Sequence, residues 1–251
     1  MSSHKIMVVE DEEILRLGTT LHLKSFGYEV VGNFSSGEEA LEKLLDIKPD
    51  VVLMDIELAG NWNGITTAGK IKEKWDVPII YVSVHADSKT IEHAKSTKPF
   101  RYMRKPFNDE ELQFTIEMAV KTHKNQKKLL EKIKNYHEII SKIPGLLYRI
   151  DTEYNVFLLN DALEKISDYK TDEIKNNGYC FFYSLIVSDD REEILNYLNN
   201  NIHSKEPLKL NYRIKNKKGQ LKNIREIINP VFENDDLICI EGLILDITGK
   251  N

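Results

Sequence analysis

Carboxylate side chains stand at the ends of two short apolar segments. Glu10 and Asp11 directly follow Ile6–Val9, and Asp55 directly follows Val51–Met54. Such short, unbroken hydrophobic runs are typical of strands in a parallel sheet that is covered on both faces. Like charges repel at short range, and burying a charge is costly unless it is paired or bound to a metal. A cluster of acids at the ends of buried strands therefore predicts a cation among them.

Helix capping explains only part of this cluster. Asp11 is a suitable N-cap residue, and Glu12 and Glu13 would complement the dipole of a following helix. Glu10 is left unexplained, because it would lie at the end of the strand rather than in the helix.

A hydroxyl and an ammonium group follow two further predicted strands. Ser83 follows Ile79–Val82, and Lys105 lies just beyond Phe100–Met103. In open α/β sheets, ligands bind beyond the carboxyl ends of the strands. Three carboxylates suit Mg²⁺, which keeps several waters and takes phosphate oxygens. The lysine and the hydroxyl can donate to a phosphoryl group, and a carboxylate can attack phosphorus.

A buried ion pair between Asp55 and Lys105 is the simpler alternative. Such a pair does not need Glu10 and Asp11 beside it, and we therefore favour a metal-dependent phosphoryl site.

The first half of the chain alternates strand and helix patterns. Apolar residues recur at helical spacing between the predicted strands, which gives five strands and five helices in roughly 120 residues. This order predicts a doubly wound α/β domain with a parallel sheet.

The second half has a different pattern. Leu146–Asp151 and Tyr154–Asn160 predict a hairpin, and three longer segments predict antiparallel strands: Leu208–Lys215, Asn223–Phe232 and Leu237–Ile247. We expect an α+β domain with an antiparallel sheet.

A helical stretch joins the two halves. Its apolar residues step by four and three: Leu129, Ile133, Tyr136, Ile140 and Ile143. Either this is one amphipathic helix packed on its own domain, or it is a parallel two-stranded coiled coil. The predicted organisation is a first domain over residues 1–122, a helical linker over 123–143 and a second domain over 144–251.

Composition indicates a soluble globular protein. The 251 residues are 41% hydrophobic and 30% charged, with a formal net charge of -5, which does not favour nucleic acid as a partner. Cys180 and Cys239 are too far apart for metal-ligand spacing. No signal peptide or membrane-spanning segment is predicted, so we expect a cytoplasmic protein.

Four segments of the first half resemble the receiver domain of two-component response regulators. They are "VVEDEE", "LMDIEL", "YVSVHAD" and "FRYMRKPF", and the resemblance covers about residues 4 to 122. It implies a flavodoxin-like sheet of strand order 2-1-3-4-5. It also implies a histidine kinase or phosphotransfer protein as partner, and homodimerisation.

The resemblance implies a role for each candidate residue. Asp55 would be the phosphoacceptor, and Mg²⁺ would be bound by Glu10, Asp11, Asp55 and the backbone carbonyl of Glu57. Ser83 and Lys105 would contact the phosphoryl group, and Ser83 and Tyr102 would form the switch pair. Two positions depart from the family: Val84 replaces a frequent alanine and Ala59 a frequent proline. Glu57 and His85 would flank the attacking water.

Three segments of the second half are "IPGLLYRIDTEYNVFLLNDALEKISDYKTDEI", "LNYRIKNKKGQLKNIREIINPVF" and the closing "EGLILDIT". The first resembles the opening of a PAS domain and the other two its three-stranded end, so the resemblance covers about residues 136 to 250. Such domains bind flavin, haem or small metabolites, or only dimerise, and the ligand here is not predicted. "GYCFFYSL" around Cys180 does not match the photosensing flavin pattern, and His203 fits a helix-end cap better than a haem ligand. Five aromatic residues are expected in the core: Tyr148, Phe157, Phe181, Phe182 and Tyr183.

The leading hypothesis is a non-enzymatic response regulator whose output is protein contacts, since no DNA-binding pattern is present. The alternative is a ligand-sensing PAS module with a modulatory or silent receiver. An aspartyl-phosphate phosphatase is disfavoured, because the acid stands on the third strand and no cap region fits.

Overall fold

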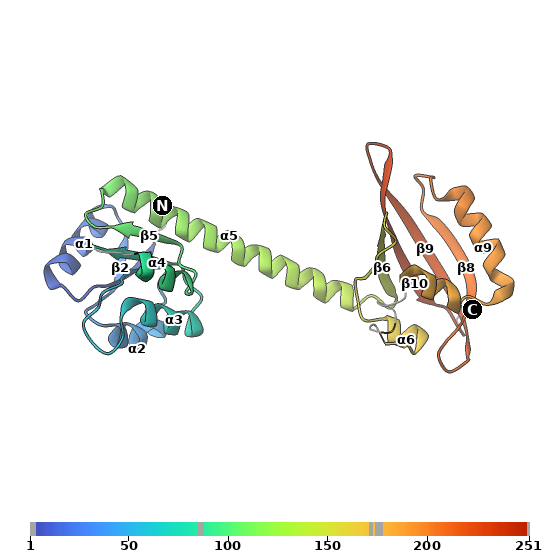
Figure 1. The fold of residues 1–251 in the computed structure, drawn as a ribbon, viewed down its shortest axis with the longest axis horizontal. Coiled ribbons are helices and arrows are strands. Elements are labelled where there is room, and N and C mark those ends of the chain that lie inside the picture. The colour runs from blue at the N-terminus through green and yellow to red at the C-terminus, as the bar shows by residue number, and fades with distance from the viewer. Residues whose placement is uncertain (1–3, 85–87, 171–172, 174–177, 250–251) are drawn as a thin grey trace. The chain divides into compact units, whose positions relative to one another are not determined.

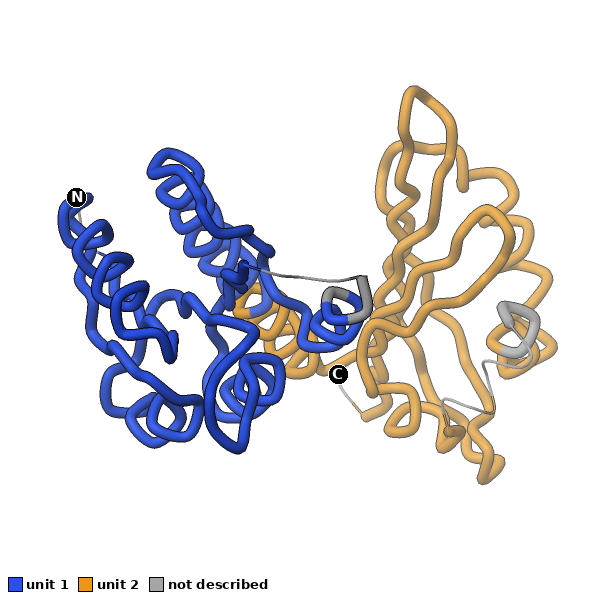
Figure 2. The backbone as a smooth tube through the Cα atoms, turned by 60° about the vertical axis from the view of Figure 1, so that its left-hand side comes forward, with its two compact units in different colours: residues 1–130 blue, residues 131–251 orange. Residues whose placement is uncertain are grey.

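The protein forms two compact units, residues 1–130 and 131–251, which Figure 2 colours separately. The computed structural model describes residues 4–84, 88–170, 173 and 178–249.

The first unit contains a parallel five-stranded sheet of order β2-β1-β3-β4-β5, which confirms the predicted topology. Its strands are β1 (Lys5–Val9), β2 (Glu29–Phe34), β3 (Val51–Asp55), β4 (Ile79–Ser83) and β5 (Arg101–Arg104). Its helices are α1 (Glu13–Ser25), α2 (Gly37–Ile47), α3 (Gly64–Lys74), α4 (Ser88–Lys95) and α5 (Asp109–Ser141) (Figure 1).

Both faces of this sheet are buried, which explains the unbroken apolar runs. Met7 and Val9 of β1 pack with residues of α2 and α3, whereas Ile6 and Val8 pack with residues of α1 and α5. Successive side chains of a strand point to opposite faces, so a sheet covered on both sides needs apolar residues at every position.

Helix α1 does not have Asp11 as its N-cap residue. Its N-cap is Glu12, not Asp11, and the Glu12 side chain makes no capping hydrogen bond. Asp11 is thereby left outside the helix.

Helix α5 passes without interruption from the first unit into the second. Its first turns are buried through Leu112, Ile116 and Ala119, but every residue from 124 to 139 is exposed. Among the apolar residues at four-and-three spacing, Leu129, Ile133 and Tyr136 are 59%, 46% and 63% exposed, whereas Ile140 and Ile143 are half-buried. Within the described residues, no helix is long and apolar enough to cross a membrane.

The second unit contains an antiparallel five-stranded sheet of order β7-β6-β10-β9-β8, as the α+β prediction requires. Its strands are β6 (Leu146–Asp151), β7 (Val156–Leu158), β8 (Leu208–Lys215), β9 (Leu221–Glu233) and β10 (Asp236–Asp246), and its helices are α6 (Leu163–Ser167), α8 (Gly178–Leu185) and α9 (Ser188–Asn201). Strands β6 and β7 form the predicted hairpin, although β7 is shorter than expected.

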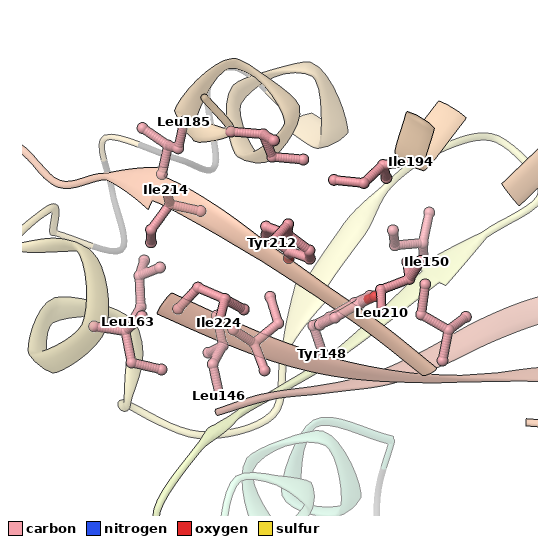
Figure 3. Close-up of a cluster of buried hydrophobic side chains, with 14 of the residues drawn as sticks. Leu146, Tyr148, Ile150, Leu163, Leu185, Ile194, Leu210, Tyr212, Ile214 and Ile224 are labelled. Atoms are coloured by element: carbon pink, nitrogen blue, oxygen red, sulfur yellow. The ribbon is translucent and has the colours of Figure 1, made fainter. Parts of the chain in front are cut away.

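One face of this sheet carries the core of the second unit. Buried and exposed residues alternate strictly along β8, so its inward side chains meet those of the helices (Figure 3). The structure places Tyr148 in this core, with Phe182 and Tyr183 packed against it. Phe157 was wrongly expected there: it is 50% exposed on β7, at the edge of the sheet. Phe181 lies outside the residues whose side chains are described.

Candidate functional site

The carboxyl ends of four neighbouring strands meet at one edge of the parallel sheet. Val9 pairs with Met54, Asp55 with Val82, and Ser83 with Arg104. This register carries Glu10, Asp55, Ser83 and Lys105 to the same edge, because each of them lies at or directly after the end of its strand.

Lys105 lies between two buried carboxylates. Its ammonium contacts Oε2 of Glu10 and lies 2.5 Å from Oδ2 of Asp55. All three side chains are at least nine-tenths buried. In the described part of the chain, no other basic side chain pairs with either acid. Two negative charges thus share one positive charge, and the site keeps an excess of negative charge.

The protonation of this cluster follows from its burial. Burial raises the pKa of Glu10, and the ammonium of Lys105 offsets this only in part. Burial alone would lower the pKa of Lys105, but hydrogen bonds to Asp55 and Glu10 outweigh it, so the pKa of Lys105 is raised. Lys105 is therefore a fixed positive charge at neutral pH.

The Asp55 carboxylate is also held from the backbone. The amide of Glu57 donates to Oδ1 of Asp55 at 3.0 Å. Gly64 packs so closely that a Cβ there would overlap the Asp55 carbonyl oxygen, and its own amide donates to the carbonyl of Ile56 at 2.9 Å. Our sequence analysis missed Gly64, although the Asn63-Gly64 pair is a signal for a tight turn.

Asp11 is positioned by contacts that the sequence did not predict. Its Oδ2 accepts a 3.0 Å hydrogen bond from the amide of Ala59. The guanidinium of Arg16 donates to the carbonyls of Glu10 and Asp11 at 2.7 and 3.1 Å. These bonds fix the segment that follows β1.

The proposed switch residues lie on adjacent strands. Ser83 is buried at the end of β4, and its carbonyl accepts from the amide of Lys105 at 2.9 Å. Tyr102 is half-buried on β5 and stacks on Tyr81 with 5.4 Å between the ring centroids. His85 lies outside the described residues.

The fit of this cluster to Mg²⁺ can be judged from its donors. Within the described residues, no group of three or more His, Cys, Asp and Glu side chains is arranged to hold a metal. Lys105 instead supplies the cation shared by Glu10 and Asp55. The donors are nevertheless carboxylate oxygens with an excess of negative charge, which is the ligand type that Mg²⁺ prefers.

Candidate ligand residues in the second unit are less concentrated. His203 is exposed just beyond the end of α9, and Cys180 lies in α8 with its side chain outside the described set. A buried carboxylate at Glu226 was missed by our sequence analysis. Period-two alternation along β9 would have found it, because Ile224, Glu226 and Ile228 all face inward.

Comparisons with known proteins agree with the two folds. Residues 6–117 match the response regulator receiver domain, and residues 156–244 match the PAS fold. The transcriptional regulatory protein PdtaR of Mycobacterium tuberculosis is 33% identical over 116 residues, which cover 46% of this chain and 56% of that protein. The response regulator GacA of Pseudomonas syringae is 38% identical over 81 residues, covering 32% of this chain and 38% of that protein. The matched segments thus span 56% and 38% of the lengths of these two relatives.

A solved structure is similar over the first half alone. The signal receiver domain of a modulated diguanylate cyclase from Desulfovibrio desulfuricans G20 is 34% identical, with a TM-score of 0.49, and covers 50% of this chain and 99% of that one. The chain therefore contains a response regulator receiver domain followed by a PAS domain.

Proposed function

We propose that Asp55 accepts a phosphoryl group from a phosphohistidine of a partner kinase or phosphotransfer protein, in a reaction that requires Mg²⁺. The observation that carries this proposal is the position of Lys105, whose ammonium lies between Glu10 and Asp55 at the carboxyl edge of the sheet.

The proposed chemistry is an attack by one carboxylate oxygen of Asp55 on phosphorus. The new P–O bond forms as the P–N bond of the donor breaks, and the electron pair of that bond stays on the imidazole nitrogen. The Glu57 amide orients the Asp55 carboxylate through Oδ1, and Lys105 donates to the incoming phosphoryl oxygens.

Mg²⁺ would be held by Glu10, Asp11, Asp55 and the backbone carbonyl of Glu57. When bound, it neutralises charge on the phosphoryl oxygens. Glu10 and Asp55 keep an excess of negative charge beside Lys105, which supports this assignment.

Exposed apolar side chains beside Lys105 suit a protein donor. Ile14 is 79% exposed and Val84 44% exposed, and both line a pocket of about 400 Å³ together with Lys105 and Pro106. A partner that covers these side chains would bring its phosphohistidine next to the site.

Phosphorylation would be transmitted by Ser83 and Tyr102. The hydroxyl of Ser83 moves toward the phosphoryl group, and Tyr102 on the adjacent strand follows it inward. The burial of Ser83 and the partial burial of Tyr102 support this switch, because a movement of either side chain would change its contacts with neighbouring residues.

The output is contact between proteins, through a homodimer joined along α5. The exposed stripe of Leu129, Ile133 and Tyr136 supports a parallel coiled coil with a second copy, since apolar residues at four-and-three spacing otherwise remain in water. Helix α5 then links the receiver to the PAS domain.

The test is the intact mass of the chain after incubation with acetyl phosphate and Mg²⁺. We expect one added phosphoryl group in the wild type and in Asp46→Asn, an exposed control on α2. None is expected in Asp55→Asn or without Mg²⁺. Labelling of Asp55→Asn at the wild-type rate, or no labelling of the wild type, would refute the proposal.

A further inference from the structure

A carboxylate is buried in the core of the PAS domain without a cation. Glu226 on β9 is 8% exposed and accepts hydrogen bonds from Tyr148 Oη at 2.6 Å and from Tyr212 Oη at 3.1 Å. Among the described residues, no lysine, arginine or histidine lies within ion-pair distance of it. An ionised carboxylate has about four acceptor sites, so two hydroxyl donors leave part of its capacity unused.

The fold makes room for this arrangement. Tyr148 on β6 reaches Glu226 across β10, where it pairs with Gly242. A Cβ at Gly242 would overlap the Tyr148 ring, so only glycine allows the tyrosine to cross the strand in this way. Figure 3 shows Tyr148 and Tyr212 entering the same core from different strands.

Glu226 borders a small cavity of about 30 Å³. That is room for roughly two water-sized groups. Four aromatic side chains line the same cavity: Tyr148, Phe182, Tyr183 and Tyr212. Aromatic faces attract cations, and a carboxylate among several rings is a favourable site for an ammonium group.

A larger pocket adjoins this cavity. It has a volume of about 370 Å³, and Tyr148, Ile150 and Leu198 line both spaces. Most of its other lining residues are apolar, and Asp151 and His203 also line it. Pockets of this size hold small organic molecules. The two spaces together suit an apolar body joined to a small cationic head.

We propose that the PAS domain binds a primary alkylammonium ion, with the ammonium at Glu226 among the aromatic rings and the alkyl chain in the adjoining pocket. The ammonium supplies the positive partner that Glu226 lacks, and two of its three N–H donors can fill the remaining acceptor sites of the carboxylate. A neutral alcohol of the same size supplies one donor and no charge.

The test is calorimetric titration of the full chain at pH 7 with n-butylamine. The control ligand is n-butanol, an uncharged compound of the same size. An alkylamine is protonated at this pH. We expect saturable binding of the amine, and binding of the alcohol at least about tenfold weaker, since a charge-assisted hydrogen bond contributes more than a neutral one. Equal affinities, or no saturable binding of the amine in the millimolar range, would overturn the proposal.

Variants locate the site. Glu226→Gln should weaken amine binding by at least about tenfold, whereas Glu233→Gln, an exposed change on the same strand, should leave it unchanged. If Glu226→Gln fails to fold, the comparison of amine and alcohol on the wild type still decides the matter. Asp55→Asn should bind the amine like the wild type, so this result is independent of phosphorylation.

Discussion

The backbone amide of Ala59 donates a 3.0 Å hydrogen bond to Oδ2 of Asp11, and thereby ties the acid after β1 to the loop between β3 and α3. Many members of the receiver family have proline at this position, and proline has no amide hydrogen to donate. One carboxylate oxygen of Asp11 therefore accepts a hydrogen bond that a proline at position 59 could not donate.

Replacing Ala59 with proline should release this oxygen. We expect Ala59→Pro to bind Mg²⁺ about fivefold more tightly, because a net hydrogen bond of roughly 1 kcal/mol no longer competes for Asp11. Intrinsic fluorescence during Mg²⁺ titration gives the affinity, since Trp62 lies in the same loop. Ala59→Gly retains the amide and should behave like the wild type. Equal affinities for all three proteins would show that the hydrogen bond does not compete with the metal.

Removing the shared ammonium should destabilise the receiver. Lys105→Ala leaves Glu10 and Asp55 buried without their cation, and we expect the free energy of unfolding at pH 7 to fall by about 3 kcal/mol. Added Mg²⁺ should reduce this loss. Urea unfolding followed by tryptophan fluorescence measures it, because both tryptophans lie in the first unit. Lys124→Ala, at an exposed lysine 3.7 Å from Asp50, should change stability by less than about 0.5 kcal/mol.

Two glycines of α3 should respond in opposite ways to the same substitution. Gly64→Ala forces a Cβ against the Asp55 carbonyl and should cost about 2 kcal/mol. Gly69→Ala meets nothing within 4 Å and should stabilise the helix by about 0.5–1 kcal/mol. The same urea experiment compares them. A Gly64→Ala protein as stable as the wild type would show that the turn adjusts without strain.

Glu226 should make the stability of the PAS domain depend on pH. Burial raises its pKa in the folded state, although the hydroxyls of Tyr148 and Tyr212 act in the opposite direction. The folded state then holds this proton more tightly than the unfolded chain. The contribution of this proton to the free energy of unfolding is fully present below the pKa of Glu226 in the unfolded chain, near 4.5. It is lost as pH rises through the pKa of Glu226 in the folded state.

Glu226→Gln should remove that slope, which is at most about 1.4 kcal/mol per pH unit for one proton. Urea unfolding between pH 5 and 8, followed by circular dichroism, measures it in the full chain. A wild-type slope that persists unchanged in Glu226→Gln would assign the pH dependence to other groups.

A charge on the exposed stripe of α5 should separate the dimer. Ile133→Lys places an ammonium in the proposed seam and should weaken dimerisation at least about tenfold. Glu131→Lys adds the same residue on the same helix but off the stripe, and should leave the dimer intact. Sedimentation equilibrium distinguishes these outcomes. A wild-type chain that is monomeric at high micromolar concentration would contradict the coiled coil.

Periodicity predicted the receiver fold well because its central strands β1, β3 and β4 are buried on both faces. The alignment of β1, β3, β4 and β5 then follows from the topology, which is why Glu10, Asp55 and Lys105 could be predicted to converge. The pattern could not reveal the amide of Ala59 or the close approach of Gly64, since backbone contacts leave little trace in side-chain type. In the PAS domain, a single acid among apolar residues was overlooked because its meaning depends on the Tyr148 and Tyr212 hydroxyls brought to it by other strands.

Because α5 is continuous, the number of residues in it fixes the direction in which its exposed stripe faces relative to its buried first turns. A helix turns by about 100° per residue, so inserting one residue between Val120 and Leu129 would rotate the exposed stripe by about 100° relative to the buried first turns. Seven residues make nearly two full turns and would restore the alignment. The length of this helix should therefore change without loss of signalling only in steps of about seven residues. The number of residues between the two domains would then matter for signalling as much as the identity of those residues.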